Sequence, residues 1–163
     1  MRVVEGVADV DDVDAALAHL TEIAEDHDVT VQAFDARYVV GRRHLERAVE
    51  LADRAIARGE NVARDRGVEI LLYAAGRRQI DDALTMGIEE GRTPLAVLVT
   101  GAGDEDGAAS AIEDWVDPAS TLADADAERV RAFFDVTDAE LGVVDGDLTD
   151  LVLERVALLD VEK

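Results

Sequence analysis

The stretch of residues 59–80 constrains the fold of this chain more than any other segment. It begins with a glycine that ends a long helix, continues with a short helix expected over Glu60–Arg66, and turns tightly at Gly67. A nearly continuous apolar run then fills Val68–Ala74, and such a run is typical of a strand covered on both faces. The stretch therefore predicts a buried central strand.

A glycine-to-arginine corner at Gly76 follows this strand and opens a helix predicted over Arg77–Met86. Elsewhere, alternating apolar and polar residues predict strands, and apolar residues three or four apart predict helices. The further strands are expected over residues 2–8, 29–34 and 95–100, and the further helices over residues 13–27, 42–58, 105–116, 125–134 and 148–159. The sequence thus predicts a single compact α/β domain over residues 1–163, with a small mixed sheet of about four strands flanked by helices and a helical C-terminal part.

The formal net charge of −22 is extreme for a chain of 163 residues. Disordered chains can carry such charge, but regular apolar periodicity and a 48% hydrophobic content argue against disorder. We interpret the acidity as adaptation to molar salt, where charge repulsion is screened over about 3 Å and carboxylates keep the surface solvated. On this interpretation the acidity reflects a halophilic habitat and not a function.

Several classes of protein are excluded by composition. The chain has no cysteine, so disulfides, thiolate zinc sites and cysteine nucleophiles are ruled out. No apolar stretch approaches the roughly 20 residues that span a bilayer, so we expect a soluble, cytoplasmic protein without a membrane partner. His19, His27 and His44 lack any metal-binding spacing, and we expect neither a metal nor a cofactor.

The charge is unevenly distributed along the chain. Residues 37–92 contain 11 arginines and 10 acidic residues, a balance of +1, whereas the rest of the chain carries −23. About one third of the sequence therefore lacks the excess of acidic residues that the remainder carries. An anionic partner is the leading explanation for basic residues kept against that background.

Four arginines lie on one narrow stripe of the long helix predicted from residue 42. At about 100° per residue, Arg43, Arg47, Arg54 and Arg58 fall within 60° of one another, over a length of about 22 Å. Such a stripe can contact successive phosphates. The alternative is an ordinary ion-paired helix face, because Glu50 and Arg54 have the favoured acid-before-base spacing.

The corner at Gly76 offers a second set of candidate ligands. Arg77, Arg78 and Gln79 follow a predicted strand end, where open α/β sheets gather their ligands, and they open a helix whose free N–H groups attract anions. Guanidinium and amide groups there can grip phosphate, sugar or base edges. The alternative is a glycine turn with charged helix-starting residues, although arginine in a first turn opposes the helix dipole.

A loop at Gly101–Gly107 imitates a dinucleotide-binding fingerprint between a strand and a helix. The spacing is wrong, because residue 106 should be glycine or alanine, and three acidic residues lie where a pyrophosphate would bind. An acidic surface loop is the favoured interpretation. A nucleotide-binding α/β enzyme that uses this loop remains the alternative function, but no carboxylate pair or nucleophile motif supports catalysis.

Two further features have a structural and a functional interpretation. Tyr73 is the best aromatic candidate for stacking on a base, although core packing is the favoured role. The last helix carries an apolar stripe that either packs within the chain or forms a partner surface. That stripe consists of Leu151, Val152, Val156 and Leu159.

The sequence resembles the kinase-binding accessory subunit of the KEOPS complex, the PRPK-binding protein family. The resemblance is carried by residues 59–63, 67–73 and 76–83, that is Gly-Glu-Asn-Val-Ala, Gly-Val-Glu-Ile-Leu-Leu-Tyr and Gly-Arg-Arg-Gln-Ile-Asp-Asp-Ala. Residues 153–159 also resemble the family's tail. Close motif agreement covers about a fifth of the chain, and the charge pattern differs as a halophilic archaeal member should.

The resemblance implies a subunit without catalytic residues. Family members bind the small kinase/ATPase of the complex, contact its other subunits indirectly, and bind the 3′ CCA end of tRNA for threonylcarbamoylation by another subunit. The residues themselves point to one basic corner that holds this end, with the four helix arginines as secondary phosphate contacts. The expected corner consists of Asn61, Arg64, Arg77, Arg78 and Gln79.

Overall fold

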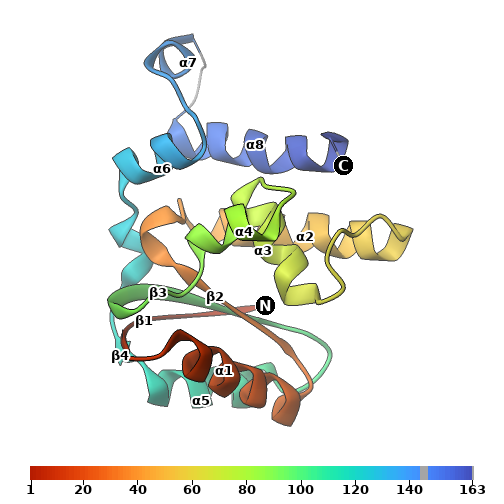
Figure 1. Ribbon diagram of the computed structural model, residues 1–163, viewed down its shortest axis with the longest axis vertical. Helices are drawn as coiled ribbons and strands as arrows, with labels where there is room; N and C mark the ends of the chain where they lie inside the picture. The colour runs from red at the N-terminus through yellow and green to blue at the C-terminus, as the bar shows by residue number, and fades with distance from the viewer. Residues whose placement is uncertain (144–146, 163) are drawn as a thin grey trace.

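The computed structural model describes residues 1–143 and 147–162, and Figure 1 shows a sheet that lies between two layers of helices. The strands are β1 (Arg2–Val10), β2 (Thr30–Asp35), β3 (Gly91–Thr100) and β4 (Asp117–Pro118). The helices are α1 (Val13–His27), α2 (Arg42–Arg58), α3 (Arg66–Ala75), α4 (Ile80–Ala83), α5 (Glu105–Trp115), α6 (Ala127–Phe133), α7 (Asp138–Val143) and α8 (Leu148–Glu162). The described residues also form the 3₁₀ turns η1 (Ala36–Tyr38), η2 (Leu84–Met86) and η3 (Thr121–Asp124).

The sheet has the strand order β2-β3-β1-β4. β1 pairs along its whole length with β3, from Arg2 opposite Val99 to Val10 opposite Gly91, and the other side of β3 pairs with β2. The α/β class and the four-stranded sheet agree with the sequence prediction, although β4 was not predicted and one predicted strand is a helix. All neighbouring strands are antiparallel, whereas the sequence predicted a mixed sheet.

Alternation along the strands divides the core between the two faces of the sheet. Phe34 and Leu98 point toward α2, α3 and α8, and Ala33 and Val97 point toward α1 and α5. Figure 1 shows the same division, with α1 and α5 below the sheet and α2, α3 and α8 above it. Each strand buries alternate side chains in the two helical layers. This fixes the pairing register of the strands, because a slip of one residue would move every side chain to the opposite face of the sheet.

The strand predicted over Val68–Ala74 is wrong, because these residues belong to α3. The Asp65 carboxylate caps this helix by accepting a hydrogen bond from the Val68 N–H at 3.0 Å, and the helix ends at Gly76 with φ 60°. Neighbouring elements bury the helix from Ile70 to Ala75 on every side. A helix without a polar face has no 3.6-residue pattern, so a short apolar run cannot distinguish it from a buried strand.

The short helix expected over Glu60–Arg66 is also absent, and residues 60–65 form a loop before α3. Gly67 makes no turn; it lies in the first turn of α3. A Cβ atom at this position would come within 3.0 Å of Asp65 Oδ1 and 3.2 Å of Gln32 Oε1. The glycine therefore permits the close approach of α3 to β2.

The helix predicted over Arg77–Met86 is reduced to the four-residue α4 and the turn η2. Gly76 ends α3 and does not open a helix: its N–H bonds the carbonyls of Leu72 and Tyr73. Residues 77–79 form the connection that follows. The prediction of an anion site at the N-terminus of a long helix over Arg77–Met86 is therefore wrong.

The other predicted elements agree with the structure. Asp12 caps α1 by accepting from the N–H groups of Asp14 and Ala15, and Gly59 ends α2 with φ 70°. The strands predicted from residues 2, 29 and 95 correspond to β1, β2 and β3, and the predicted C-terminal helices correspond to α5, α6 and α8. Within residues 1–143 and 147–162, no helix combines the length and apolar character needed to cross a bilayer.

Candidate nucleic-acid interface

The arginine stripe of α2 faces α8, and its two central members are ion-paired. Arg47 bonds Glu50 at 2.8 Å, and Arg54 bonds Asp160 of α8 at 2.8 Å. The expected Glu50–Arg54 pair therefore does not form. Arg43 and Arg58, at the two ends of the stripe, form no ion pair with any residue that the structure describes.

α2 and α3 run antiparallel, and two contacts fix their relative register. Near the start of α2, a nitrogen of the His44 ring lies 2.7 Å from the Ala74 carbonyl, and near its end Asp53 bonds Arg66 at 2.7 Å. α3 thus separates the residues before it from those after it by about 15 Å, since ten residues rise 1.5 Å each. Any site built from both sets must extend along the helix pair.

The expectation of one basic corner is wrong, because the predicted site residues fall into two groups at opposite ends of α3. We call the first the corner group, which consists of Arg43, Arg77, Arg78 and Gln79. We call the second the loop group, which consists of Arg58, Asn61 and Arg64. Arg47 and Arg54 lie between them along α2.

In the corner group, Arg77 turns back onto the C-terminal helices. Its guanidinium carbon lies 4.7 Å from the centre of the Phe133 ring, and Nη2 donates a hydrogen bond to the Phe133 carbonyl. Arg155 of α8 lies beside it and bonds the Phe134 carbonyl at 3.1 Å and Glu140 at 2.6 Å. These groups line a pocket of about 140 Å³. Arg78 and Gln79 are exposed, so they are the members of this group that can reach a ligand.

The loop group is held by a buried carboxylate. Glu69 is 0% exposed and accepts hydrogen bonds from the N–H groups of Val62, at 3.1 Å, and Ala63, at 3.0 Å. The amide of Asn61 donates to the Ala63 carbonyl at 2.8 Å, so this side chain stabilises the loop. Arg64 is exposed and forms no ion pair within the described part of the chain.

A hydrogen-bonded cluster joins α8 to the α2–α3 pair between the two groups. The Tyr73 hydroxyl and Arg54 both donate to Asp160, at 2.9 Å and 2.8 Å. Partial burial acts to raise the pKa of Asp160, but these hydrogen bonds outweigh it and the pKa is lowered. Burial, followed by the bond to Asp160, raises the pKa of Tyr73. Tyr73 itself is 0% exposed, so it cannot stack on a base.

The apolar stripe of the last helix is core and not a partner surface. Every one of its four residues is at most 1% exposed and packs with α2 and α3 on the same side of the sheet. The proposal that these side chains contact a partner is therefore wrong. They are Leu151, Val152, Val156 and Leu159.

Carboxylates within the loop at residues 101–107 already accept hydrogen bonds from its N–H groups. The Gly101 N–H donates to Glu105 at 3.0 Å, and the Gly107 N–H donates to Asp104 at 2.9 Å. A Cβ atom at Gly103 would lie 2.2 Å from the His27 carbonyl. These glycines permit tight packing against the end of α1, and the carboxylates occupy the positions that a phosphate would need. No group of His, Asp and Glu side chains among the described residues is arranged to hold a metal.

Two residues of the corner were missed from the sequence. Phe133 and Arg155 are far from Arg77 along the chain, and only the packing of α6 and α8 against the end of α3 brings them together. A signal was present for Arg155, because it interrupts the apolar stripe of the last helix. A cation on a buried stripe needs a partner, and here the partners are carbonyls and Glu140.

Comparison with known proteins identifies the family of this chain. No curated protein gives a significant match to the chain. The family model described as kinase binding protein CGI-121 matches residues 6–160, which includes both arginine groups and all of the sheet except its first residues. The chain therefore belongs to the CGI-121 family of non-catalytic, kinase-binding proteins.

Proposed function

We propose that this protein is the accessory subunit of a KEOPS complex in a halophilic archaeon, and that it acts in the cytoplasm. In this role it binds the small kinase/ATPase of the complex and the 3′ CCA end of tRNA, and contacts other subunits indirectly. The observation that carries the proposal is the CGI-121 family match over residues 6–160. The extreme acidity, with a net charge of −22, supports the halophilic assignment.

The arrangement of arginines supports an RNA ligand. Arg43, Arg58, Arg64 and Arg78 lie along the α2–α3 pair without ion-pair partners among the described residues. In a chain with more than twice as many acidic as basic residues, unpaired arginines are unexpected without an anionic ligand. The planar, weakly hydrated guanidinium also suits short contacts with phosphates and bases.

Molar salt favours recognition of an unpaired 3′ end. Charges separated by more than about 3 Å are screened at 1 M salt, so long-range attraction of tRNA is weak there. Unstacked bases offer stacking faces and hydrogen-bonding edges that act at contact distance. The exposed Arg78 and Gln79 provide such groups, and Arg77 braces their loop against Phe133.

Two binding experiments test the two halves of this function. The purified chain is mixed in molar salt with the kinase subunit from the same host, and complex formation is followed by size-exclusion chromatography. Coelution supports the kinase half, and separate elution contradicts it. In parallel, the chain is titrated with intact tRNA and with tRNA lacking its terminal CCA; tighter binding of intact tRNA supports the RNA half.

A further inference from the structure

The outer edge of β2 pairs with no other strand that the structure describes, and Ala33 on this edge is covered, with 2% of its surface exposed. β2 is the first strand in the order β2-β3-β1-β4, and its other side pairs with β3. The Ala33 carbonyl accepts a hydrogen bond from the side-chain amide of Gln32 at 3.1 Å, which indicates that this carbonyl faces away from β3. Strand residues two apart direct their N–H and C=O groups to the same side, so those of Val31 also face outward. This edge presents a partly unused ladder of hydrogen-bonding groups.

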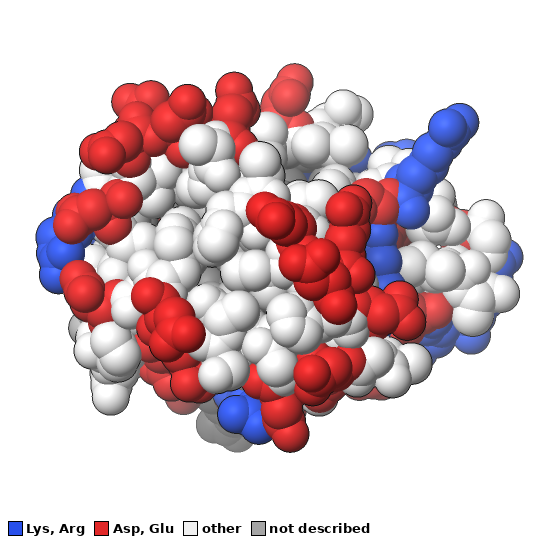
Figure 2. All heavy atoms as spheres, turned by 90° about the horizontal axis from the view of Figure 1, so that it is seen from below, with Lys and Arg blue, Asp and Glu red and all other residues white. Residues whose placement is uncertain are grey.

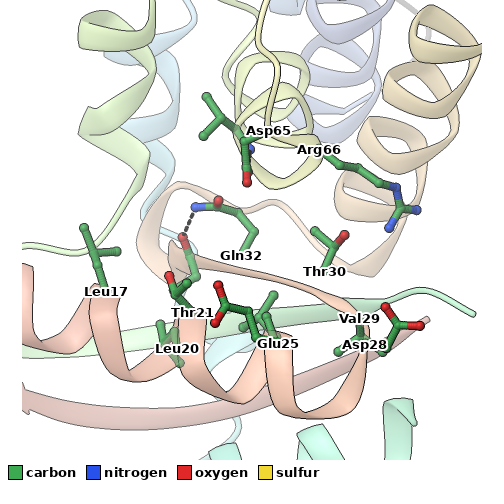
Figure 3. A pocket seen from close by; sticks show the side chains of 14 residues that line it. Leu17, Leu20, Thr21, Glu25, Asp28, Val29, Thr30, Gln32, Asp65 and Arg66 are labelled. Atoms are coloured by element: carbon green, nitrogen blue, oxygen red, sulfur yellow. Dashed lines mark hydrogen bonds between the residues drawn. The ribbon is translucent and has the colours of Figure 1, made fainter. Parts of the chain in front are cut away.

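A groove runs along this edge between two helices. Figure 3 shows Leu17, Leu20 and Glu25 of α1 on one side of the strand that carries Thr30 and Gln32, and the start of α3 on the other side. The groove has a volume of about 510 Å³. Residues 30–33 of β2 line this groove over about 13 Å at 3.3 Å per residue, which matches an extended segment of four residues.

The walls of the groove combine apolar surface with uncompensated negative charge. Leu17 of α1 lines the groove and is 42% exposed, so it offers apolar surface to a ligand. Glu25 and Asp28 contribute carboxylates that no described residue pairs in an ion pair. Arg66 is the one cation among the described residues that line the groove, and it is already ion-paired, because it donates two hydrogen bonds to Asp53 at 2.7 Å and 2.9 Å.

We propose that this groove is a docking site for an extended segment of a partner protein that carries a basic side chain and adds to the sheet beside β2. Main-chain hydrogen bonds to Val31 and Ala33 provide the affinity, and Leu17 and Glu25 select an apolar and a basic side chain. The acidic walls exclude a nucleic acid. The site lies outside both arginine groups and does not depend on the proposed tRNA binding.

Gln32 acts as the cover of this edge in the free protein. Its amide satisfies the outward carbonyl of Ala33, and its Oε1 lies near Gly67 of α3. A docking strand replaces this amide with its own N–H. Edge strands are commonly protected from uncontrolled pairing by such local devices, and a side chain that can rotate away leaves the edge usable.

Selection from a library of random heptapeptides against the full chain in molar salt tests the proposal. We expect enrichment of peptides that alternate β-branched with polar residues and contain Arg or Lys. Methylation of the peptide's backbone nitrogens one at a time should then weaken binding about tenfold or more at every second residue and leave the others nearly unchanged. No enrichment, enrichment of acidic peptides, or a uniform response to methylation overturns the proposal.

Matched variants locate the selected peptide. Glu25→Arg should weaken binding about fivefold, since it replaces an attractive charge with a repulsive one. Glu22→Arg, an equal charge change on an exposed residue of α1 outside the groove, should have no effect. Gln32→Ala should strengthen binding, because it frees the Ala33 carbonyl. Equal effects of Glu25→Arg and Glu22→Arg would show that the peptide binds elsewhere.

Discussion

The hydroxyl of Tyr73 donates a 2.9 Å hydrogen bond to Oδ1 of Asp160, and this contact joins the buried helix α3 to the last helix. Arg54 of α2 holds the other carboxylate oxygen at 2.8 Å. One carboxylate therefore fixes three helices that carry both arginine groups. The positions of the proposed RNA contacts depend on this cluster.

Tyr73→Phe removes the hydroxyl and leaves Arg54 as the hydrogen-bond donor to the Asp160 side chain among the described residues. Because the lost bond is to a charged acceptor, we expect the free energy of unfolding to fall by about 1–2 kcal/mol. Urea denaturation in molar salt measures this change. Tyr38→Phe is the matched control, since the Tyr38 hydroxyl forms no hydrogen bond with described residues and its loss should change little. Equal effects of the two substitutions would show that the Asp160 bond has no special weight.

The imidazole of His44 should make stability depend on pH. Burial lowers the pKa of His44 from 6.5 to about 4, against the opposing effect of its bond to the Ala74 carbonyl. Below pH 6.5 His44 binds a proton in the unfolded chain but stays neutral in the folded chain. The free energy of unfolding therefore falls as the pH falls from 6.5 to about 4. The loss reaches about 3 kcal/mol, at 1.36 kcal/mol per pKa unit.

His44→Gln lacks this titration, and comparing the two proteins removes the effect of the many carboxylates. We expect the free energy of unfolding of the parent protein to fall more steeply between pH 6.5 and 4.5 than that of the variant. Parallel curves would contradict a neutral, buried His44.

Glu69→Gln should loosen the loop that carries Asn61 and Arg64. The carboxylate accepts from the N–H groups of Val62 and Ala63, and the neutral amide is a weaker acceptor with one oxygen fewer. Amide hydrogen exchange at these two residues should accelerate by about tenfold or more, corresponding to at least 1.4 kcal/mol. Unchanged exchange would show that other contacts order the loop.

The two arginine groups should have different roles in tRNA binding. Arg64→Glu in the loop group should weaken binding of intact and CCA-less tRNA equally, because a contact with a backbone phosphate does not depend on the presence of the 3′ end. Arg92→Glu is the control: Arg92 lies on β3 and is paired with Asp9 and Asp117, away from both groups. A selective effect of Arg64→Glu on intact tRNA would instead assign the 3′ end to the loop group.

The sequence predicted the amphipathic elements well and the buried helix badly. Polar faces and capping residues, such as Asp12 and Gly59, indicate α1 and α2 in the sequence. Alternating apolar and polar residues indicate β1 and β2. α3 has no polar face, because α2, α8 and β2 enclose it, and its apolar run therefore predicts a strand that the structure does not contain. The cap at Asp65 was the local signal that could have identified it.

The candidate site was predictable in residue type but not in arrangement. With Val68–Ala74 as a strand, the corner and the loop were expected to lie together, whereas the helix places them at opposite ends. Contacts between distant segments were also out of reach, such as Arg77 with Phe133 and Arg54 with Asp160. Figure 2 shows that the acidic residues form a broken ring around an uncharged centre on the α1–α5 face, with basic side chains at its margin. The concentration of unpaired arginines on the α2–α3 side agrees with the uneven charge of the sequence.

The most direct test is the ratio of the affinities for intact tRNA and for tRNA lacking its CCA end, measured in molar salt for the parent chain and for Arg78→Glu. We predict that the parent chain binds intact tRNA about tenfold or more tightly than tRNA lacking its CCA end. Arg78→Glu should bring this ratio close to one, because a lost contact with an unpaired base or its phosphate weakens binding by about 1–3 kcal/mol. Equal binding of the two tRNAs by the parent chain, or an unchanged ratio in Arg78→Glu, would contradict the assignment of the 3′ end to the corner group.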